Sequence, residues 1–286
     1  MNYNQNFQHS EVLQGHRDAV YCLLTIGEYL ASGSRDTTII LWDLESREAV
    51  NTFKGHMKEV FCLAEWENYL ISGSRDTTIR LWNLDTKREE TVLEAHGAPV
   101  LCLTNLRQYL ASGYFDGSIK VWNLETREVE TILEGHADPV ISLTTVGNQL
   151  VSGSDDNTIK IWNLNTKEIK ATLEGHRGLI TSLVTLEDYL VSASEDNTIR
   201  IWDLETNQEE RVLEEDGAVT CLVVVEEHLV SSSKGGTVSF WNLENANVEA
   251  TLRSDKSYAQ CLAKIGSYLA CGFDDGTIKL VTTLIK

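Results

Sequence analysis

Histidine, serine, aspartate and tryptophan recur together along this chain. In five consecutive stretches these four residue types follow one another in the same order and with the same spacing. Serine, histidine and aspartate are the residues with which many hydrolases carry out nucleophilic attack. The five sets are His16/Ser32/Asp36/Trp42, His56/Ser72/Asp76/Trp82, His96/Ser112/Asp116/Trp122, His136/Ser152/Asp156/Trp162 and His176/Ser192/Asp196/Trp202.

Five equivalent sets argue against an active site, because a hydrolase needs one such constellation in one pocket with an oxyanion hole. We interpret each set as a structural tetrad. The aspartate accepts from the imidazole and from turn amides, the second imidazole nitrogen meets the serine hydroxyl, and the hydroxyl meets the indole N–H. A buried network with every member paired fixes a loop against a sheet. The prediction is a non-enzymatic protein with no catalytic residues, no cofactor and no metal, since the histidines belong to different copies.

The tryptophan spacing reveals the elements that must carry these tetrads. Tryptophan recurs with a period of about 40 residues, at Trp42, Trp82, Trp122, Trp162, Trp202 and Trp241. Each copy contains four short runs rich in Val, Ile, Thr and aromatic residues, with Gly, Asp, Ser and Asn between them. In the first copy these runs are "AVYCLLTI", "YLASGS", "TIILWDL" and "REAVNTF". Seven such copies predict an all-β fold, a seven-bladed propeller with four strands per blade.

The Gly-His to Trp-Asp pattern at this period resembles the WD40-repeat family, and the resemblance covers residues 9–286. It implies four-stranded antiparallel blades and a structural role for the tetrads. It also implies that the N-terminal strand, within "SEVLQGH", completes the last blade and so closes the ring. We therefore expect one propeller domain over residues 9–286, preceded by a polar leader at residues 1–8.

The last two copies depart from the tetrad pattern. The sixth has Glu215 and Asp216 near the histidine position and Gly235 in place of aspartate, and it keeps only Ser231 and Trp241. The seventh has Asp255, Cys271, Asp275 and Val281 at the four positions. A buried polar group that has lost its partner costs about 1–3 kcal/mol, so we expect these two blades to open first.

Composition bounds the class of partner. The formal net charge is −19, which argues against nucleic-acid or anionic-membrane binding because both need a broad basic surface. Wholly apolar runs such as residues 221–225 are too short to span a bilayer. Five of the six cysteines share one repeat position, which is typical of a small buried side chain rather than a disulfide framework. We expect a monomer in a reducing compartment, the cytoplasm or the nucleus.

The repeat pattern explains most residues by their structural role. The residues that vary between copies at exposed positions are therefore the candidates for function. The resemblance implies that one rim of the channel binds peptides, through three positions per blade. The residues before the turn aspartate are Arg35, Arg75, Phe115, Asp155, Glu195, Lys234 and Asp274. The residues after the first-strand valine position are Tyr21, Phe61, Leu101, Ile141, Thr181, Thr220 and Gln260. Two residues earlier are Ala19, Glu59, Pro99, Pro139, Leu179, Ala218 and Tyr258.

Apolar and cationic side chains gather in one arc of this rim. The arc consists of Tyr21, Arg35, Phe61, Arg75, Leu101, Phe115, Ile141 and Tyr258. Aromatic anchors beside forked cationic donors suit a peptide interface. The hypothesis is a protein-interaction scaffold whose arc binds a partner segment carrying an apolar side chain and a carboxylate or phosphate. In the alternative, Arg35 and Arg75 simply pair with nearby acids such as Glu59 or Asp274.

Other functions remain open at this point. The rim arginines and the short "GEYLASGS" connection also resemble the propellers of F-box ubiquitin-ligase substrate receptors, although the printed sequence contains no F-box segment. A propeller enzyme working at the channel mouth would need convergent carboxylates or metal ligands in one place. A purely architectural subunit of a larger complex would instead use a large apolar patch on the blade edges.

Overall fold

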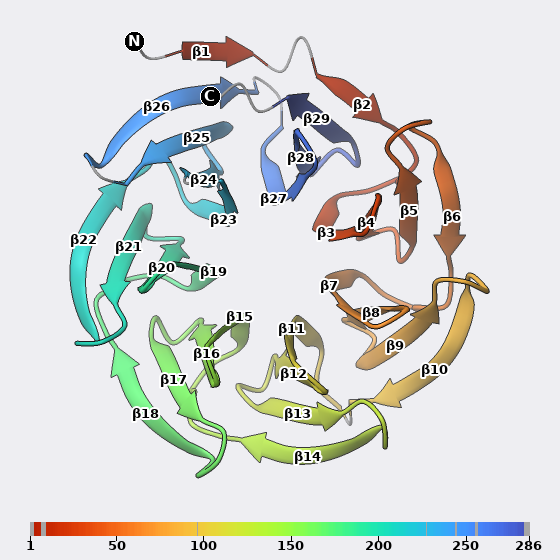
Figure 1. The fold of residues 1–286 in the computed structure, drawn as a ribbon, viewed down its shortest axis with the longest axis horizontal. Coiled ribbons are helices and arrows are strands. Elements are labelled where there is room, and N and C mark those ends of the chain that lie inside the picture. Colours follow the sequence, from red (N-terminus) through yellow and green to blue (C-terminus); the bar gives the residue numbers. More distant parts are fainter. Residues whose placement is uncertain are drawn as a thin grey trace.

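Seven sheets, each built on four antiparallel strands, stand around a central axis, so the chain forms a seven-bladed β-propeller (Figure 1). The computed structural model describes residues 3–6, 10–95, 97–226, 228–243, 245–254 and 257–282. This architecture confirms the fold class predicted from the repeat. Within the described residues there is no helix long and apolar enough to cross a membrane.

Each blade runs outward from the axis in chain order. The innermost strands are β3 (Val20–Ile26), β7 (Val60–Trp66), β11 (Val100–Leu106), β15 (Val140–Val146), β19 (Ile180–Leu186), β23 (Val219–Val225) and β27 (Ala259–Ile265). The second strands are β4 (Tyr29–Ser34), β8 (Tyr69–Ser74), β12 (Tyr109–Tyr114), β16 (Gln149–Ser154), β20 (Tyr189–Ser194), β24 (His228–Ser233) and β28 (Tyr268–Phe273). The third strands are β5 (Ile39–Asp43), β9 (Thr78–Asn83), β13 (Ile119–Asn123), β17 (Ile159–Asn163), β21 (Thr198–Asp203), β25 (Thr237–Asn242) and β29 (Ile278–Thr282). The outer strands are β6 (Ala49–Phe53), β10 (Arg88–Glu94), β14 (Glu128–Leu133), β18 (Glu168–Leu173), β22 (Gln208–Glu214), β26 (Asn247–Arg253) and, for blade 7, β2 (Glu11–Leu13).

The antiparallel connections give the ring two faces. The loop before each innermost strand and the turn between the second and third strands lie on one face, which we call the tetrad face. The turns between the first and second strands and between the third and outer strands lie on the other, which we call the opposite face. Any loop or turn residue can therefore be assigned to one of the two faces from its place in the repeat.

The N-terminal strand closes the ring as expected. β2 pairs antiparallel with β29, from Glu11 opposite Leu280 to Leu13 opposite Ile278. The last blade is thus built from both ends of the described chain (Figure 1). This closure pairs the outer side of β29, which would otherwise be an open sheet edge.

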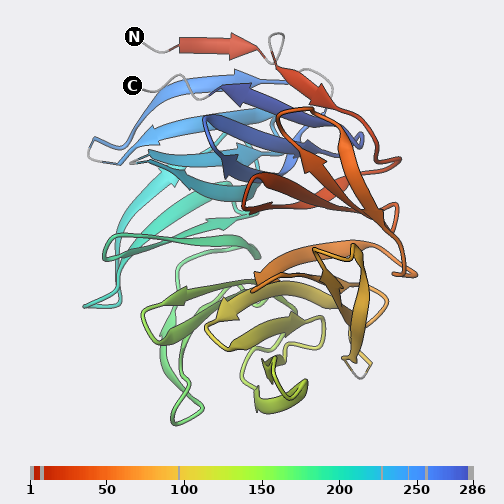
Figure 2. The ribbon, with the colours of Figure 1, turned by 45° about the vertical axis from the view of Figure 1, so that its right-hand side comes forward.

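The segment read as a polar leader contains a further strand. β1 (Tyr3–Asn6) pairs parallel with β26 of blade 6, from Tyr3 opposite Ala250 to Asn6 opposite Arg253, and lies along the edge of the ring (Figure 2). Charged side chains discourage pairing at a sheet edge. β26 carries two charged residues, as do β14 and β18, and β6 carries none, so edge charge alone does not select β26. The sequence "YNQN" has no apolar alternation that would have predicted a strand.

The hydrophobic core lies between blades rather than within each one. Ile39 and Leu41 of blade 1, for example, pack in one cluster with Leu70 and Trp82 of blade 2. Equivalent clusters join the other neighbours. A blade therefore depends on its neighbours for burial, as in other repeat folds.

The shared cysteine position contributes to these blade interfaces. The thiol of Cys102 donates to the carbonyl of Val140 in the next blade at 3.4 Å. Ser142, at the same position one blade on, donates to the carbonyl of Ile180 at 3.1 Å. Burial raises the pKa of Cys22 to about 12. The six cysteines are free, and these thiols act as small packing groups.

Candidate binding rim

Four blades contain the hydrogen bonds expected of the tetrad. In blade 2, His56 Nδ1 lies 2.8 Å from Asp76 Oδ2, and His56 Nε2 lies 2.7 Å from Ser72 Oγ. The indole N–H of Trp82 donates to the same Ser72 oxygen at 2.8 Å. The sets that begin at His16, His136 and His176 make the same three contacts.

The four tetrad serines cannot serve as nucleophiles in this arrangement. Ser32, Ser72, Ser152 and Ser192 are fully buried, and each hydroxyl oxygen already meets an imidazole and an indole. A substrate carbonyl has no access to such an oxygen. The arrangement fixes the loop before each innermost strand to the sheet, which is a structural role.

The tetrad carboxylates are held ionised. Burial alone would raise the pKa of Asp76, but hydrogen bonds from His56, Thr78 and the Met57 backbone outweigh it and hold that pKa well below its usual range. The pKa of Asp36 is lowered in the same way, and the pKa of Asp196 falls to about 2. Each ionised carboxylate accepts the Nδ1–H of its histidine, so Nε2 accepts the serine proton.

Blade 3 departs from the expected tetrad. Ser112 donates to the hydroxyl of Tyr114 at 2.8 Å and accepts the indole N–H of Trp122 at 2.8 Å. Tyr114 is fully buried, and the ammonium of Lys120 lies 4.9 Å from its ring centroid. Asp116 is exposed and accepts from Ser118. His96 lies outside the described residues.

Blade 6 satisfies its polar groups by a different route. The Glu215 carboxylate accepts from the Ser231 hydroxyl, and from Ser239 at 3.3 Å. The Asp216 carboxylate accepts from Ser233 at 2.7 Å and from Thr237. Tetrad aspartates elsewhere accept from the equivalent threonine or serine. An acid in the loop has therefore replaced the acid of the turn, and the expected unpaired groups are not found among these residues.

Gly235 makes this replacement possible. A Cβ atom at this position would lie 2.5 Å from Asp216 Oδ1. The turn aspartate and the loop aspartate therefore compete for one space. Burial raises the pKa of the neighbouring Glu215 carboxyl. The ionised form of Glu215 is therefore less favourable in the folded protein than in the unfolded chain.

Blade 7 removes the polar groups instead of pairing them. Cys271 is fully buried at the serine position, and Phe273 is fully buried two residues later, where blade 3 has Tyr114. Lys279 lies over the Phe273 ring at 4.4 Å, as Lys120 does over Tyr114. Val281 has no polar group to satisfy. Asp275 accepts from the Thr277 hydroxyl at 2.6 Å, and Asp255 lies outside the described residues.

The tetrads predict how stability depends on pH. The unfolded chain takes up protons on its carboxylates near pH 4 and on its histidines near about 6.5. Burial lowers the pKa of His136 and His176, although Asp156 and Asp196 partly offset this. Groups whose folded pKa is depressed stabilise the fold above the unfolded pKa and lose that contribution as pH falls. We expect the free energy of unfolding to be level above pH 7, to fall below about 6.5, and to fall more steeply below about 4.

Denaturant titrations between about pH 3 and 8 measure this dependence. Added salt is needed, because it screens the repulsion among the excess acids, which itself weakens as pH falls. The Glu215→Gln variant removes a group with the opposite dependence, since a raised pKa favours the fold as pH falls. A free energy of unfolding that rises from pH 7 to pH 5 in this variant would contradict the account.

A β-bulge in every blade presents the second rim position. Pairing between the first and second strands shifts register after the first residue in all seven blades. The extra residue is Tyr21, Phe61, Leu101, Ile141, Thr181, Thr220 or Gln260. A bulged residue is left out of the ladder and its side chain is re-aimed. The register explains why this position varies freely between copies.

Backbone hydrogen bonds join the other two rim positions. The N–H of Arg35 donates to the carbonyl of Ala19 at 2.9 Å, and the N–H of Phe115 donates to that of Pro99 at 3.1 Å. Blades 2, 4, 5 and 6 repeat the bond through Arg75, Asp155, Glu195 and Lys234. The three positions inferred from the repeat therefore lie together on the tetrad face.

Within the arc, side chains from neighbouring blades lie close together. The rings of Tyr21 and Phe61 are 5.5 Å apart between centroids. The pKa of Tyr21 is raised by burial, lowered by Arg35, and raised again by Glu59, Asp18 and Tyr258. Leu101 and Ile141 are half-buried, whereas Phe115 is 60% exposed.

Both arginines have acidic neighbours. Arg75 Nη1 lies 2.9 Å from Glu59 Oε1, and Arg35 Nε lies 3.8 Å from Asp18 Oδ2. The arginine side chains are each 56% exposed. Ion pairs this exposed contribute about 0–1 kcal/mol, so a bound anion can displace them. Further round the rim, Lys234 is paired with Glu195 at 2.6 Å.

The sequence reasoning missed two features of the surface. Met57 is 80% exposed on the tetrad face of blade 2, the blade that carries Phe61 and Arg75 of the arc. Its only signal was an apolar residue directly after the histidine, where blades 1 and 5 have arginine. A cavity between blades 3 and 4 on the opposite face was also missed. In the sequence, this cavity is indicated only by Gly147, Asn148 and Asn165, which stand where several other copies have acidic residues.

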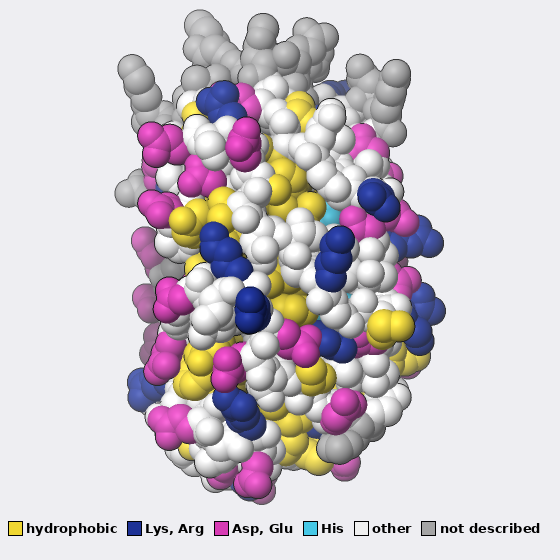
Figure 3. Space-filling view, turned by 90° about the vertical axis from the view of Figure 1, so that its right-hand side faces the viewer, with side chains coloured by type: hydrophobic (Ala, Val, Ile, Leu, Met, Phe, Trp, Pro, Cys, Tyr) yellow, Lys and Arg dark blue, Asp and Glu magenta, His cyan; other side chains and the backbone are white. Residues whose placement is uncertain are grey.

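The side of the ring seen in Figure 3 shows no patch of a single charge sign. On the side of the ring seen in Figure 3, acidic and basic side chains are interspersed with apolar ones. Exposed Val12, Ile132, Ile169 and Val212 lie on outer strands of four different blades. Scattered apolar residues of this kind are ordinary for a protein surface.

Comparison with known proteins places the chain among repeat propellers. A 47-residue stretch is 45% identical to part of WD repeat-containing protein 18 of Bos taurus, covering 16% of this chain and 11% of that protein. A 48-residue stretch is 42% identical to part of WD repeat-containing protein AAC3 of Dictyostelium discoideum, covering 16% of this chain and 10% of that protein. The chain thus spans about a tenth of the length of these curated relatives. A crystal structure of the computationally designed Ika8 protein is similar with a TM-score of 0.78 and 28% identity, over 94% of this chain and 85% of that one.

The family described as WD40 (WD domain, G-beta repeat) matches residues 7–43, 47–83, 87–123, 127–163 and 167–203. These five matches cover well over half of the chain and coincide with the five complete copies of the sequence pattern. Propellers of this family generally serve as scaffolds for protein interaction. The chain belongs to the WD40 repeat family.

Proposed function

We propose that this protein is a non-catalytic interaction scaffold whose tetrad-face arc binds a segment of a partner protein. The arc comprises the eight residues defined from the sequence, with Met57 added. The segment carries an apolar side chain and, close to it, a carboxylate or a phosphate. The observations that support the proposal are the exposed apolar side chains of Phe115 and Met57 and the two exposed guanidinium groups of Arg35 and Arg75, all on the tetrad face of blades 1 to 3.

Apolar and cationic groups have distinct roles in this proposal. Phe115 and Met57 provide the area that a partner side chain covers, and the contacting rings of Tyr21 and Phe61 lie on blades 1 and 2. Arg35 is the freer cation, because its contact with Asp18 is long and both side chains are about half exposed. An incoming carboxylate or phosphate accepts paired hydrogen bonds from such a guanidinium.

The Arg35→Glu/Arg75→Glu variant tests the proposal. A displayed peptide library containing acidic and phosphorylated members is selected on the wild-type protein. The variant is expected to lose at least tenfold in affinity for the selected peptides, since each charge-assisted hydrogen bond is worth about 1.5–3 kcal/mol. Phe115→Ala is expected to weaken the same peptides by about tenfold, in keeping with a moderate interface anchor.

A matched variant separates local contact from overall charge. Arg47→Glu/Arg127→Glu makes the same change in net charge on the opposite face, where the two arginines are exposed and paired with Glu11 and Glu90. This control is expected to bind like the wild type. If both double variants bind the selected peptides equally well, the arc is not the binding site.

A further inference from the structure

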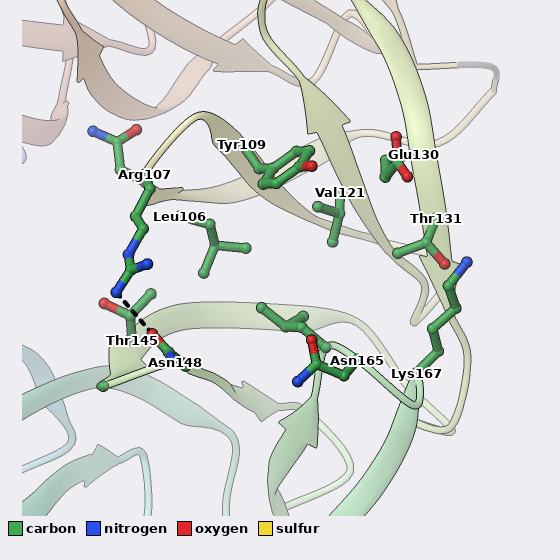
Figure 4. A pocket seen from close by; sticks show the side chains of 13 residues that line it. Leu106, Arg107, Tyr109, Val121, Glu130, Thr131, Thr145, Asn148, Asn165 and Lys167 are labelled. Atoms are coloured by element: carbon green, nitrogen blue, oxygen red, sulfur yellow. Dashed lines mark hydrogen bonds between the residues drawn. The ribbon is translucent and has the colours of Figure 1, made fainter.

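A second candidate site lies in the cavity between blades 3 and 4 on the opposite face. The cavity has a volume of about 410 Å³, which is within the range of small-ligand sites. Leu106, Tyr109, Val121 and Leu164 provide apolar walls, and Arg107 lies at one end (Figure 4). Glu130 and Lys167 lie toward the other end (Figure 4).

The cavity is short of acids compared with the same place in other blades. At the position of Asn165, blades 1, 2, 3 and 5 have Glu45, Asp85, Glu125 and Glu205. At the position of Arg107, the other blades have glycine or glutamate. Among the described residues, Glu130 is the one acid that lines the cavity, against the two cations Arg107 and Lys167. On a chain with a net charge of −19, this is a locally cationic site.

Arg107 occupies a backbone conformation that suits glycine better. Its φ is 59°, and the equivalent Gly27, Gly147 and Gly266 have φ of 55°, 56° and 55°. A non-glycine residue in this left-handed region carries backbone strain. The guanidinium Nη2 donates to Asn148 Oδ1 at 3.0 Å, across the boundary between the two blades. Its remaining N–H groups have no carboxylate partner in the part of the chain that the structure describes.

We propose that this cavity binds an apolar group that ends in a carboxylate. The apolar group lies between Leu106, Val121 and Leu164. The carboxylate lies at the end held by Arg107 and Asn148, away from Glu130. A free small carboxylic acid and the C-terminal residue of a protein chain share this chemistry, and they are separated by the choice of probe.

Three probes measure the binding by NMR titration of the full chain. They are N-acetyl-phenylalanine, an eight-residue peptide that ends in phenylalanine with a free carboxylate, and the same peptide with an amidated C-terminus. A site for small acids binds the first probe as tightly as the second, and a site for chain ends binds the second more tightly. The amidated peptide is expected to bind at least tenfold more weakly than the free one, because it cannot pair with the guanidinium.

Two of the test variants introduce a residue that other blades have at the same position. They are chosen so that a loss of binding is not caused by a loss of folding. Arg107→Gly introduces the residue of three other blades and is expected to weaken the free carboxylate probes at least tenfold. Val121→Phe introduces the residue found at this position in blade 6, Phe240, and is expected to abolish binding by filling the cavity. Arg127→Gly makes the same change at another left-handed position of the opposite face, with φ of 65°, and is expected to bind normally.

The proposal is overturned if neither free carboxylate probe binds, or if the amidated peptide binds as well as the free one. It is also overturned if Arg107→Gly binds as tightly as Arg127→Gly. If Val121→Phe does not fold, the comparison of the two arginine variants still decides.

Discussion

Gly235→Asp is expected to lower the free energy of unfolding by about 3–5 kcal/mol, although it restores the residue that all the other blades have at this position. The physical reason is the position of Asp216. A Cβ at residue 235 would lie 2.5 Å from Asp216 Oδ1 and 2.7 Å from its Cγ. A second carboxylate would then compete for the hydroxyl groups of Ser233 and Thr237. Guanidinium denaturation monitored by tryptophan fluorescence measures the change.

Rescue by neighbouring substitutions identifies the cause. The triple variant Glu215→His/Asp216→Arg/Gly235→Asp introduces the residues of blade 5, His176, Arg177 and Asp196. It is expected to recover most of the stability lost in Gly235→Asp, since a conventional tetrad can then form with Ser231 and Trp241. Strong non-additivity is the signature of groups that share one space. A Gly235→Asp variant as stable as the wild type would show that the two acids do not compete.

His56→Ala is the second large effect, with an expected loss of about 3–5 kcal/mol in the free energy of unfolding. The imidazole is buried between Asp76 and Ser72. Its removal leaves a half-buried carboxylate and a buried hydroxyl without their main partner. The loss is expected to appear first as faster amide exchange in blade 2.

The same substitution at a surface histidine is the control. His228 lies on β24 and is paired with Glu249, with both side chains partly exposed. His228→Ala is expected to change the free energy of unfolding by about 1 kcal/mol or less. Equal losses in the two variants would mean that the tetrad histidines contribute no more than an exposed ion pair.

Much of the fold was predictable because the same sequence pattern occurs in several successive copies. One tryptophan period and one strand pattern, seen in register in successive copies, fix the number of blades, the closure by β2 and the contacts of four tetrads. Each copy confirms the interpretation of the others. Residues such as Cys22 and Ser142 could be assigned to packing for the same reason, since they occupy the same position of the repeat.

Departures from the repeat were harder to predict, because their compensation comes from residues outside the pattern. Gly235 looks like a lost carboxylate in the sequence, but the loop acid Asp216 fills its space. Tyr114 stands where other copies have a small serine, and the sequence does not show that its hydroxyl pairs with Ser112. In both cases the contact depends on a side-chain direction that spacing alone does not reveal. The parallel pairing of β1 likewise depends on the outer edge of blade 6, which is far from β1 in sequence.

The expectation that blades 6 and 7 open first needs a different reason from the one the sequence offered. Blade 6 pairs its polar groups through Glu215 and Asp216, and blade 7 replaces serine and tryptophan with Cys271 and Val281. Among the described residues at the tetrad positions, neither blade therefore carries the unpaired groups that motivated the expectation. Amide exchange across the seven blades measures which blades open first. Because the pKa of Glu215 is raised, we expect blade 6 to open more readily than blade 7 at neutral pH.

The central claim is that partner segments bind on the arc, and one cross-linking experiment tests it most directly. A photoreactive phenylalanine analogue is placed at Phe115 in one variant and at Ile132 in another. Both residues belong to blade 3 and are 60% and 50% exposed, but Ile132 lies on outer strand β14. Peptides selected on the wild-type protein are then irradiated with each variant. We predict cross-linking through residue 115 and not through residue 132. Cross-linking through residue 132 alone, or equally through both, would contradict the account.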